Sequence, residues 1–337
     1  MSVFFCEIKV LTILSVFLES KNAIIFRMNE NLNGILNVYK EAGWTSFDVV
    51  AKLRCILKTK KIGHGGTLDP SVTGVLPIAV GKSTRLLEYM EAAGKIYEGQ
   101  VTIGFSTETE DADGAIVNQT PVKNNLTESE IDSAMSRFVG KIKQIPPMYS
   151  AVKINGKKLY EYARAGQTIE RPAREITIKS FVRTSPIDWN KEEGLVTFSF
   201  KVECSKGTYV RTLAVDLADS LGYAGHMSKL QRTASNGLLI KDAIKLSKIE
   251  EIQESGKLST ILYPAEYAVS DLPRVNLTTV QFDMARVGKK FAQSDWTNEV
   301  ETADSSVNKT KQQEYLLTDL SLLTTEKFAA FYNDKLV

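Results

Sequence analysis

The residues with the clearest chemical potential lie in a glycine-rich segment, residues 63–77, with the sequence GHGGTLDPSVTGVLP. Three glycines precede Asp69, which indicates a loop whose backbone lies close to another group. Pro70 restricts Asp69 to extended or turn geometry, and the apolar residues that follow would anchor the loop in the core. A single carboxylate on such a loop could act as a nucleophile or a general base. An Asp-Pro turn by itself is more often structural, so the pattern alone leaves both interpretations open.

The next segment, residues 81–84 (GKST), has the ending of a phosphate-binding P-loop but lacks its beginning. That motif requires a glycine five positions before the second glycine, and here the position holds Leu76, followed by Pro77. Without that glycine the backbone amides cannot form the anion cradle. We therefore exclude ATP or GTP hydrolysis and expect the start of a helix capped by Ser83.

Cysteine and histidine are too sparse to predict a metal centre or a disulfide framework. The three cysteines are widely separated and form no CxxC pair, and the chain has two histidines, His64 and His226. Catalysis must therefore rest on other side chains.

The segment around Asp69 closely resembles the catalytic motif GHxGTLDPxxTGxLP of the TruB-type tRNA pseudouridine synthases. The resemblance extends from about Gly34 to Arg232, with weaker similarity to about Leu272, and covers several blocks in the order that the family has. It implies an enzyme that flips out and isomerises one T-loop uridine of tRNA (position 55 in tRNA numbering). In that family the aspartate of the motif is the catalytic residue, which gives Asp69 this role. Nothing is oxidised, reduced or hydrolysed in this reaction, so the resemblance implies no cofactor and no metal.

Two further residues acquire a catalytic role through the resemblance. Tyr97, in KIYE at residues 95–98, matches the tyrosine that stacks on the target base, although an aromatic residue in a strand is usually part of the core. Arg211, in SKGTYVRT at residues 205–212, matches the arginine that pairs with the catalytic carboxylate. A guanidinium beside Asp69 would keep the carboxylate ionised in a partly desolvated pocket. A cation is otherwise unfavourable at the start of a helix, which favours this interpretation of Arg211.

Four residues are implied as substrate-binding. Lys40, in NVYK at residues 37–40, matches the lysine of the first family motif near the active site; without the match it would be a solvated lysine at the end of a strand. His64 corresponds to the histidine that inserts into the T-loop and occupies the space of the flipped nucleotide. Leu230 corresponds to a leucine that lines the uracil pocket, and Arg232 to an arginine nearby.

Hydrophobic periodicity and turn residues predict mixed α and β structure without the regular βαβ alternation of a doubly wound sheet. Strands are predicted at Ile35–Val38, Val75–Val80, Lys95–Ile103 and, with clean alternation, Leu195–Cys204. We predict helices capped by Ser46 (with Phe47 on the apolar face), by Ser83 and by Thr127 (in a capping box with Glu130), and a further helix at Thr212–Leu221. The fold class is therefore α+β, and the resemblance implies a bent mixed β-sheet catalytic domain flanked by helices, with a small C-terminal β-rich PUA-like domain.

The chain divides into three predicted parts. Residues 1–27 are apolar-rich, but their longest uncharged stretch, Val10–Leu18, is far shorter than the ~20 residues needed to span a bilayer. We expect these residues to be an incidental extension and the functional chain to begin near Met28. Residues 28–270 are the predicted pseudouridine synthase catalytic domain. Residues 271–337 are the predicted PUA-like domain, with a polar loop at Gln293–Gln313 and strands at Glu314–Thr318 and Phe328–Tyr332.

Overall charge does not identify a partner, but its distribution is informative. The net charge is only +2, from 42 Lys and Arg against 40 Asp and Glu. Residues 51–61 carry five bases and no acid, residues 153–183 carry eight bases and three acids, and residues 107–113 are net acidic. Basic stretches of this kind could neutralise phosphates or could be ordinary solvated surfaces. From the resemblance we expect the T-arm of tRNA as the partner, no membrane, no required protein partner, a monomer and a cytoplasmic location.

Three alternatives to this function stay open. The chain could be a pseudouridine synthase for another RNA site, a non-catalytic tRNA-binding folding chaperone, or a small-molecule nucleosidase. The presence of Asp69, Tyr97 and Arg211 together argues against the chaperone, and the basic stretches argue against the nucleosidase.

Overall fold

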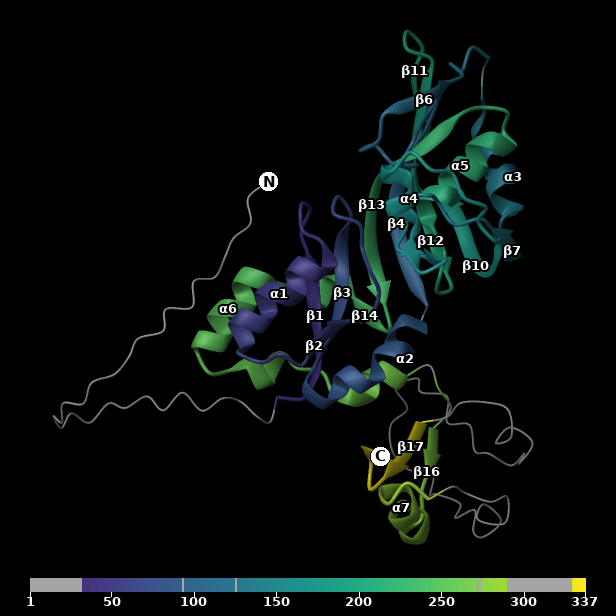
Figure 1. The fold of residues 1–337 in the computed structure, drawn as a ribbon. Helices are drawn as coiled ribbons and strands as arrows, with labels where there is room; N and C mark the ends of the chain where they lie inside the picture. The colour runs from purple at the N-terminus through teal and green to yellow at the C-terminus, as the bar shows by residue number, and fades with distance from the viewer. Residues whose placement is uncertain (1–31, 93, 125, 271, 273, 290–328) are drawn as a thin grey trace, which may run out of the picture.

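A computed structural model describes residues 32–92, 94–124, 126–270, 272, 274–289 and 329–337. At its centre lies an eleven-stranded mixed sheet with the order β15-β1-β3-β13-β4-β12-β10-β7, from which β2, β11 and β14 branch (Figure 1). The strands on the main path are β15 (Ile244–Lys245), β1 (Gly34–Lys40), β3 (Thr73–Val80), β13 (Gly225–Ser235), β4 (Lys95–Ile103), β12 (Leu195–Cys204), β10 (Arg174–Arg183) and β7 (Gly140–Gln144). The branches are β2 (Ile62–His64), β11 (Asp188–Asn190) and β14 (Leu238–Leu239).

Strand β13 joins the two halves of this sheet. It runs antiparallel to β4 along most of its length, but it pairs with β3 in parallel at only two positions, Gln231 with Thr73 and Arg232 with Gly74. Its register shifts twice against β4, and the second shift follows Arg232 directly. Such irregularities bend a strand and increase its twist. The α+β class with a large mixed sheet is thus confirmed, and the sheet changes course beside Arg232.

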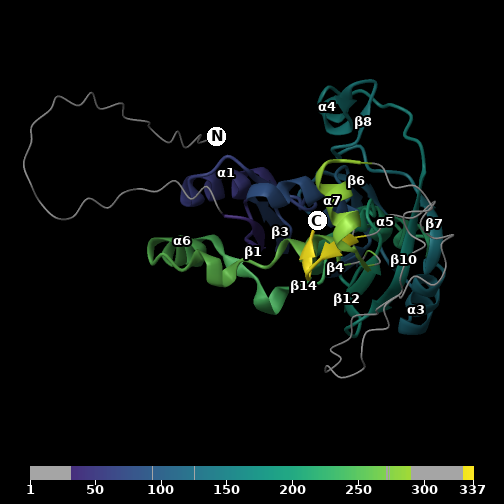
Figure 2. The same cartoon turned by 90° about the horizontal axis from the view of Figure 1, so that it is seen from below.

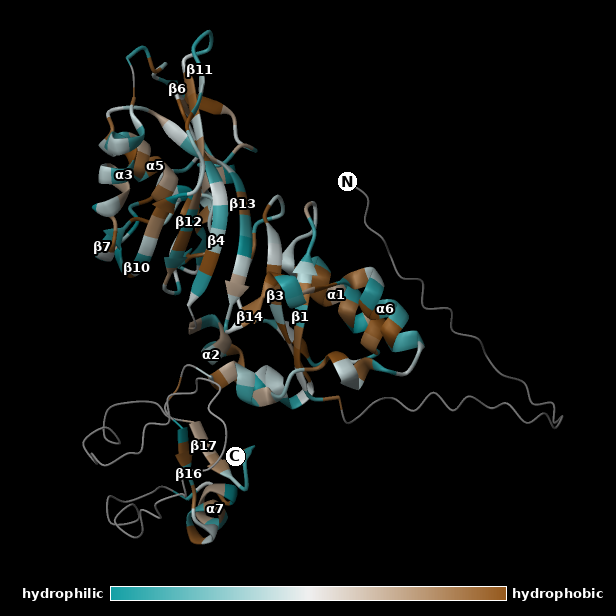
Figure 3. Cartoon of the chain, turned by 180° about the vertical axis from the view of Figure 1, so that it is seen from behind, coloured by the Kyte–Doolittle hydropathy of each residue, from teal (hydrophilic) through white to brown (hydrophobic). Residues whose placement is uncertain are grey.

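Two helices cover the half of the sheet that contains β1 and β3. Helix α1 (Ser46–Leu57) and helix α6 (Leu246–Glu254) lie side by side (Figure 2), and Lys52 of α1 forms an ion pair of 2.9 Å with Glu250 of α6. Helix α1 buries Val49, Val50 and Leu53 against the core. Hydrophobic residues mark β1, β3 and the neighbouring α1, whereas β4 and β13 carry many hydrophilic residues (Figure 3).

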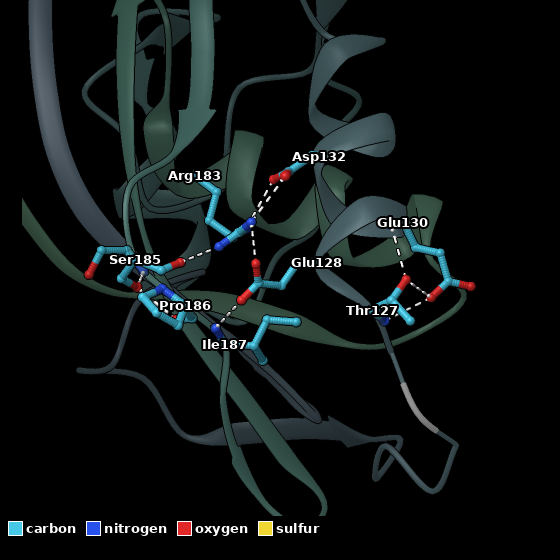
Figure 4. A network of polar contacts seen from close by, with 9 residues as sticks. Thr127, Glu128, Glu130, Asp132, Arg183, Ser185, Pro186 and Ile187 are labelled. Atoms are coloured by element: carbon cyan, nitrogen blue, oxygen red, sulfur yellow. Dashed lines mark hydrogen bonds and ion pairs between the residues drawn. The ribbon is translucent and has the colours of Figure 1, made fainter.

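The other half of the sheet packs against α5 (Val210–Ser220) and α3 (Glu128–Ser136). Strand β12 alternates as predicted, with Phe198 and Phe200 among its buried residues. Arg183 at the end of β10 holds α3 in place, because its guanidinium lies 2.8 Å from a Glu128 oxygen and 3.0 Å from an Asp132 oxygen (Figure 4). The capping box of Thr127 and Glu130 at the start of α3 is confirmed.

The predicted capping residues of two helices are wrong. Thr45, not Ser46, caps α1, since the Thr45 hydroxyl accepts from the Asp48 amide and the Asp48 carboxylate accepts from the Thr45 amide. The helix therefore turns Phe47 outward, where it is 65% exposed. Ser83 lies inside a 3-10 helix, Gly81–Leu86, rather than at its start, and the Lys82 amide is satisfied by the Asn33 side chain. The remaining α-helical segment, α2 (Leu87–Ala92), is short.

The described part of the C-terminal region forms a separate three-stranded sheet. Strands β16 (Arg274–Asn276) and β17 (Ala329–Tyr332) pair in parallel, β18 (Lys335–Leu336) pairs antiparallel with β17, and α7 (Thr279–Arg286) lies against them. Phe282 of α7 stacks on Tyr332, with ring centroids 4.2 Å apart. Strand β17 agrees with the strand predicted at Phe328–Tyr332, but Glu314–Thr318 and Gln293–Gln313 lie outside the described residues. The PUA-like assignment and the three domain boundaries stay predictions.

The remaining elements are short. They are β5 (Phe105–Thr107), β6 (Ile116–Gln119), β8 (Lys153–Ile154), β9 (Lys157–Lys158) and α4 (Leu159–Arg164), with 3-10 turns at Ile240–Asp242, Leu258–Ile261 and Ala265–Val269. Among the described residues, no helix has the length and apolar character required to cross a bilayer.

Candidate active site

Asp69 lies on the loop between β2 and β3, and hydrogen bonds from α1 fix this loop. The Ser46 hydroxyl pairs with both the amide and the carbonyl of Leu68, at 2.9 and 3.2 Å. On the other side of Asp69, the Pro70 carbonyl accepts from the Gly43 amide at 2.9 Å. The side chain of Ser46 that we expected to cap the helix thus anchors the loop instead.

Lys40 is fully buried beneath the same loop. Its ammonium donates to the carbonyls of Trp44, Pro70 and Glu41 at 2.6, 3.0 and 3.1 Å. Burial lowers the pKa of Lys40 to about 8, and the nearby Asp69 carboxylate opposes that shift. The side chain is therefore placed to hold the Asp69–Pro70 turn, and it is not a solvated lysine.

Arg232 holds the loop from the opposite side and is also fully buried. Its guanidinium donates to the carbonyl of Val75 at 2.7 Å and to that of Gly66 at 3.0 Å. Gly74 allows this close approach: its φ is +110°, and a Cβ there would lie 2.2 Å from the Arg232 carbonyl oxygen. Glycine is the residue that tolerates both conditions.

Replacing Gly74 by alanine is expected to destabilise the fold strongly. Left-handed backbone alone costs roughly 1–2 kcal/mol per non-glycine residue, and overpacking adds typically about 1–3 kcal/mol. Gly222→Ala is the matched control, because Gly222 has φ +83° but an added Cβ there would meet no described atom within 4 Å. Urea unfolding of both variants measures the difference. Equal losses of unfolding free energy would show that the contact with Arg232 contributes nothing.

Lys40→Met is expected to change how stability depends on pH. With its pKa lowered from 10.5 to about 8, Lys40 binds a proton less readily in the folded than in the unfolded chain. The unfolded state then holds more protons between these pH values, so the unfolding free energy of the wild type rises with pH across this window, by up to about 3 kcal/mol relative to the variant. Urea midpoints at pH 7.5 and pH 9.5 test this, with the exposed Lys248→Met as control. Parallel slopes for wild type and Lys40→Met would contradict the shift.

Arg211, at the start of α5, connects two carboxylates. Its Nε lies 3.1 Å from Asp69 Oδ2 and its Nη1 lies 3.5 Å from Asp111 Oδ2, while the guanidinium also donates to the carbonyls of Thr109 and Tyr149 at 2.7 and 2.9 Å. The side chains of Arg211 and Asp111 are 7% and 9% exposed, whereas that of Asp69 is 42% exposed. Arg211 is thus fixed on one side and presents Asp69 to solvent on the other.

The electrostatics of Asp69 combine two opposing effects. Burial raises the pKa of Asp69 above its ordinary value, and the positive charge of Arg211 opposes this rise. As the sequence predicts, Arg211 lowers the pKa of Asp69, but burial raises it by more. A carboxylate with a raised pKa that remains held by a guanidinium is a better proton acceptor than a free aspartate.

A cavity of about 580 Å³ opens at Asp69. Five of the seven predicted site residues line it: Asp69, Tyr97, Arg211, Leu230 and Arg232. Tyr97 is 7% exposed, and the Arg232 guanidinium lies 6.0 Å from its ring centroid. Two exposed bases, Arg174 and Lys206, also line the cavity. The volume lies within the range of about 300–1,000 Å³ that is typical of small-molecule ligand pockets.

The other two predicted residues do not line this cavity in the described part of the chain. Lys40 acts beneath the loop, as described above. His64 is the last residue of β2, paired with Ile78 of β3, and its Nδ1 is buried without a hydrogen-bond partner among the described residues. Burial lowers the pKa of His64. Its predicted insertion into the T-loop stays a prediction.

Sequence reasoning missed two residues of this site. Asp111 lies in the acidic stretch 107–113, and only the fold shows that it faces Arg211. Gln144, at 3% exposure, pairs its side-chain amide with the backbone of Tyr209, donating to the carbonyl at 3.0 Å and accepting from the amide at 2.8 Å. The acidic stretch 107–113 is a sequence feature that could have pointed to Asp111, whereas no sequence feature points to Gln144.

The sequence matches two family models. Residues 54–210 match the TruB family pseudouridylate synthase N-terminal domain, and residues 211–270 match the tRNA pseudouridylate synthase B C-terminal domain. The chain is 99% identical over 310 residues to tRNA pseudouridine synthase B of Lactococcus lactis subsp. cremoris (strain MG1363), covering 92% of this chain and 94% of the relative. It is 62% identical to the protein of the same name from Streptococcus thermophilus (strain CNRZ 1066), covering 73% and 83%.

Solved structures agree with these matches. A Cbf5-Nop10-Gar1 complex contains a chain of 29% identity with a TM-score of 0.59, covering 76% of this chain and 67% of that one. An H/ACA RNP bound to a substrate RNA containing 2′-deoxyuridine contains one of 26% identity with a TM-score of 0.56, covering 77% and 68%. The family models, the relatives and the fold lead to one assignment: the chain belongs to the TruB family of pseudouridylate synthases, which are isomerases.

Proposed function

We propose that this chain isomerises the T-loop uridine of tRNA, at position 55 in tRNA numbering, with Asp69 as the catalytic residue. The observation that carries the proposal is the Asp69–Arg211 pair, 3.1 Å apart, in the wall of a cavity of about 580 Å³ that Tyr97 and Leu230 also line. The tRNA substrate is supported by the names of two relatives whose alignments cover 92% and 73% of this chain.

The reaction breaks the bond from ribose C1′ to N1, turns the uracil and forms a bond from C1′ to C5. The proton on C5 is lost and N1 gains one, so the product is an isomer of the substrate. Asp69 could attack C1′ to give a covalent adduct, or remove the C2′ proton to give a glycal. The half-buried carboxylate suits either step, and we leave both routes open.

The target base must leave the RNA stack to reach Asp69. Flipping a base costs a few kcal/mol, and stacking on an aromatic ring returns ~1–3 kcal/mol. Tyr97 and Tyr209 are both aromatic residues of the cavity wall, and Tyr97 is the one that the family motif matches; Leu230 lines the same cavity. We therefore assign the stacking contact to Tyr97 and an apolar contact to Leu230.

We assign to Lys40 and Arg232 the role of holding the catalytic loop in its conformation. Both are fully buried, and their donors bond to backbone carbonyls of the loop and of the residues next to it. We propose that they support substrate binding by holding the loop, Arg232 from the cavity wall and Lys40 from below. His64 keeps its proposed contact with the T-loop.

The surroundings of the cavity favour a polymer over a free nucleoside. A second hollow of about 630 Å³ shares Val72 and Leu230 with the cavity at Asp69. Nucleotides that flank the target could continue into it. The exposed bases Arg174 and Lys206 are placed for phosphate contacts, which position RNA without reading its sequence.

A tritium-release assay tests the function. The purified protein is mixed with unmodified tRNA tritiated at uridine C5, and the modified position is then mapped. One equivalent released from the T-loop uridine supports the proposal, and an isolated T-arm should serve as well as whole tRNA. Release from another uridine would keep the reaction but change the substrate, whereas tight binding without release would indicate the folding chaperone. The monomeric state and the cytoplasmic location stay predictions.

A further inference from the structure

A loop that contributes Asp111, Ala112 and Asp113 to the wall of the second hollow makes a further connection to the start of α5. Residues 108–115 join β5 to β6, and within this loop Glu110 has φ +65°, a left-handed conformation that residues other than glycine and asparagine rarely adopt. The residues on either side of Glu110 both hold Arg211: Thr109 through its carbonyl, at 2.7 Å, and Asp111 through its carboxylate, at 3.5 Å. The turn at Glu110 is what lets these two neighbours converge on one guanidinium.

The Glu110 side chain itself reaches the residue next to Arg211. The hydroxyl of Thr212 donates to Glu110 Oε2 at 2.5 Å. Two successive residues of α5 are thus bound by three successive residues of the loop. The carbonyl of Glu110 also accepts from the Met227 amide at 3.1 Å, which ties the turn to β13. The loop is therefore fixed to the sheet and to the helix at the same residue.

The start of α5 needs such a contact from outside the helix. Its N-cap, Tyr209, makes no side-chain capping bond to a described residue, and its first turn contains no acid. Arg211 adds a positive charge at the end of the helix where the backbone dipole is already positive. Glu110 brings an acidic group to this turn from elsewhere in the chain. Its hydrogen bond to Thr212 requires only an oxygen acceptor, so a glutamine at this position could keep the bond without the charge.

We propose that Glu110 is a positioning residue: it holds the first turn of α5 against the 108–115 loop, fixing Arg211 and, through Arg211, the Asp69 carboxylate. In the described part of the chain Glu110 lines neither the cavity at Asp69 nor the adjoining hollow, so it acts through Arg211 and not by touching the RNA. The inference rests on the proposed activity toward tRNA.

Four variants test it by single-turnover tritium release at saturating tRNA, with the Kd for tRNA measured by filter binding. Glu110→Asn tolerates the left-handed turn but is one methylene too short to reach Thr212, and Thr212→Val removes the same bond from the helix side. Each should lower the rate constant about tenfold, equivalent to about 1.4 kcal/mol of barrier, and leave the Kd within about twofold. The double variant should be no slower than the slower single one. Glu110→Gln should recover most of the rate.

Several outcomes would overturn the proposal. Rate constants within about twofold of wild type for both single variants would show that the contact does not position Arg211. A weaker Kd with an unchanged rate constant would mean that Glu110 contacts the RNA. Effects that add in the double variant would mean that the two residues act separately. If Glu110→Asn does not fold, Thr212→Val tests the same bond alone. Absence of turnover in the wild type would instead count against the proposed function.

Discussion

Asp69→Asn is expected to lower the single-turnover rate constant by about 10²–10⁴-fold if Asp69 acts as a general base, the range that a positioned acid–base group contributes. If Asp69 acts as a nucleophile, we expect a larger loss. Asparagine has the shape of aspartate and can still accept from Arg211, so the fold should persist and the Kd for tRNA should stay within about twofold. Tritium release and filter binding measure the two quantities on the same preparation.

The control for Asp69→Asn is Asp188→Asn, an exposed aspartate on β11 that lines neither the cavity at Asp69 nor the adjoining hollow. It should retain the wild-type rate. Turnover by purified Asp69→Asn within tenfold of wild type would refute the catalytic assignment. A large loss of tRNA binding would instead show that the carboxylate contributes mainly to recognition.

Arg211→Lys is expected to have the second-largest effect, a fall of roughly 10²-fold in the single-turnover rate constant, the size seen when one preorganised donor is removed from an active site. The guanidinium holds Asp69, Asp111 and two carbonyls from fixed directions. A lysine ammonium is a compact charge on a flexible stem and cannot reproduce that fork. Tritium release with tRNA at saturation measures the loss.

Arg183→Lys provides a matched control, because Arg183 also binds two carboxylates, Glu128 and Asp132 (Figure 4), but lines neither the cavity at Asp69 nor the adjoining hollow. It should change the thermal midpoint slightly and the rate constant not at all. If Arg183→Lys and Arg211→Lys slowed the reaction equally, the effect would reflect general loss of structure and not the contact with Asp69.

The sequence was sufficient to bring together the residues of the cavity wall. Asp69, Tyr97 and Arg211 are separated along the chain, yet their motifs occur in the order of one family, and the fold places all three around one cavity. Strand β12 could be predicted to the residue from its alternation, and β4 from its content of β-forming residues. Local signals of this kind do not depend on what packs against them.

The errors arose where distant partners decide the outcome. Ser46 is a good capping residue by type, but Thr45 takes that place and Ser46 bonds to Leu68 instead. Lys40 and Arg232 are fully buried, although charged residues are rarely buried without partners, and their partners are backbone carbonyls that carry no sequence signal. Asp111 belongs to an acidic stretch typical of a solvated loop, and only the tertiary structure turns it toward Arg211.

The bonds of Arg232 also bear on the order in which the protein is made. This side chain donates to the carbonyls of Val75 and Gly66, which precede it by 157 and 166 residues. During synthesis the loop that bears Asp69 leaves the ribosome before β13 does. Most of the catalytic domain is made before Arg232 can form its hydrogen bonds to this loop. Contacts between residues so far apart in sequence are among the slowest to form. A growing chain therefore carries its nucleophile or base in a loop held only by the earlier residues Lys40, Gly43 and Ser46, and we expect competence for catalysis only after β13 has been inserted.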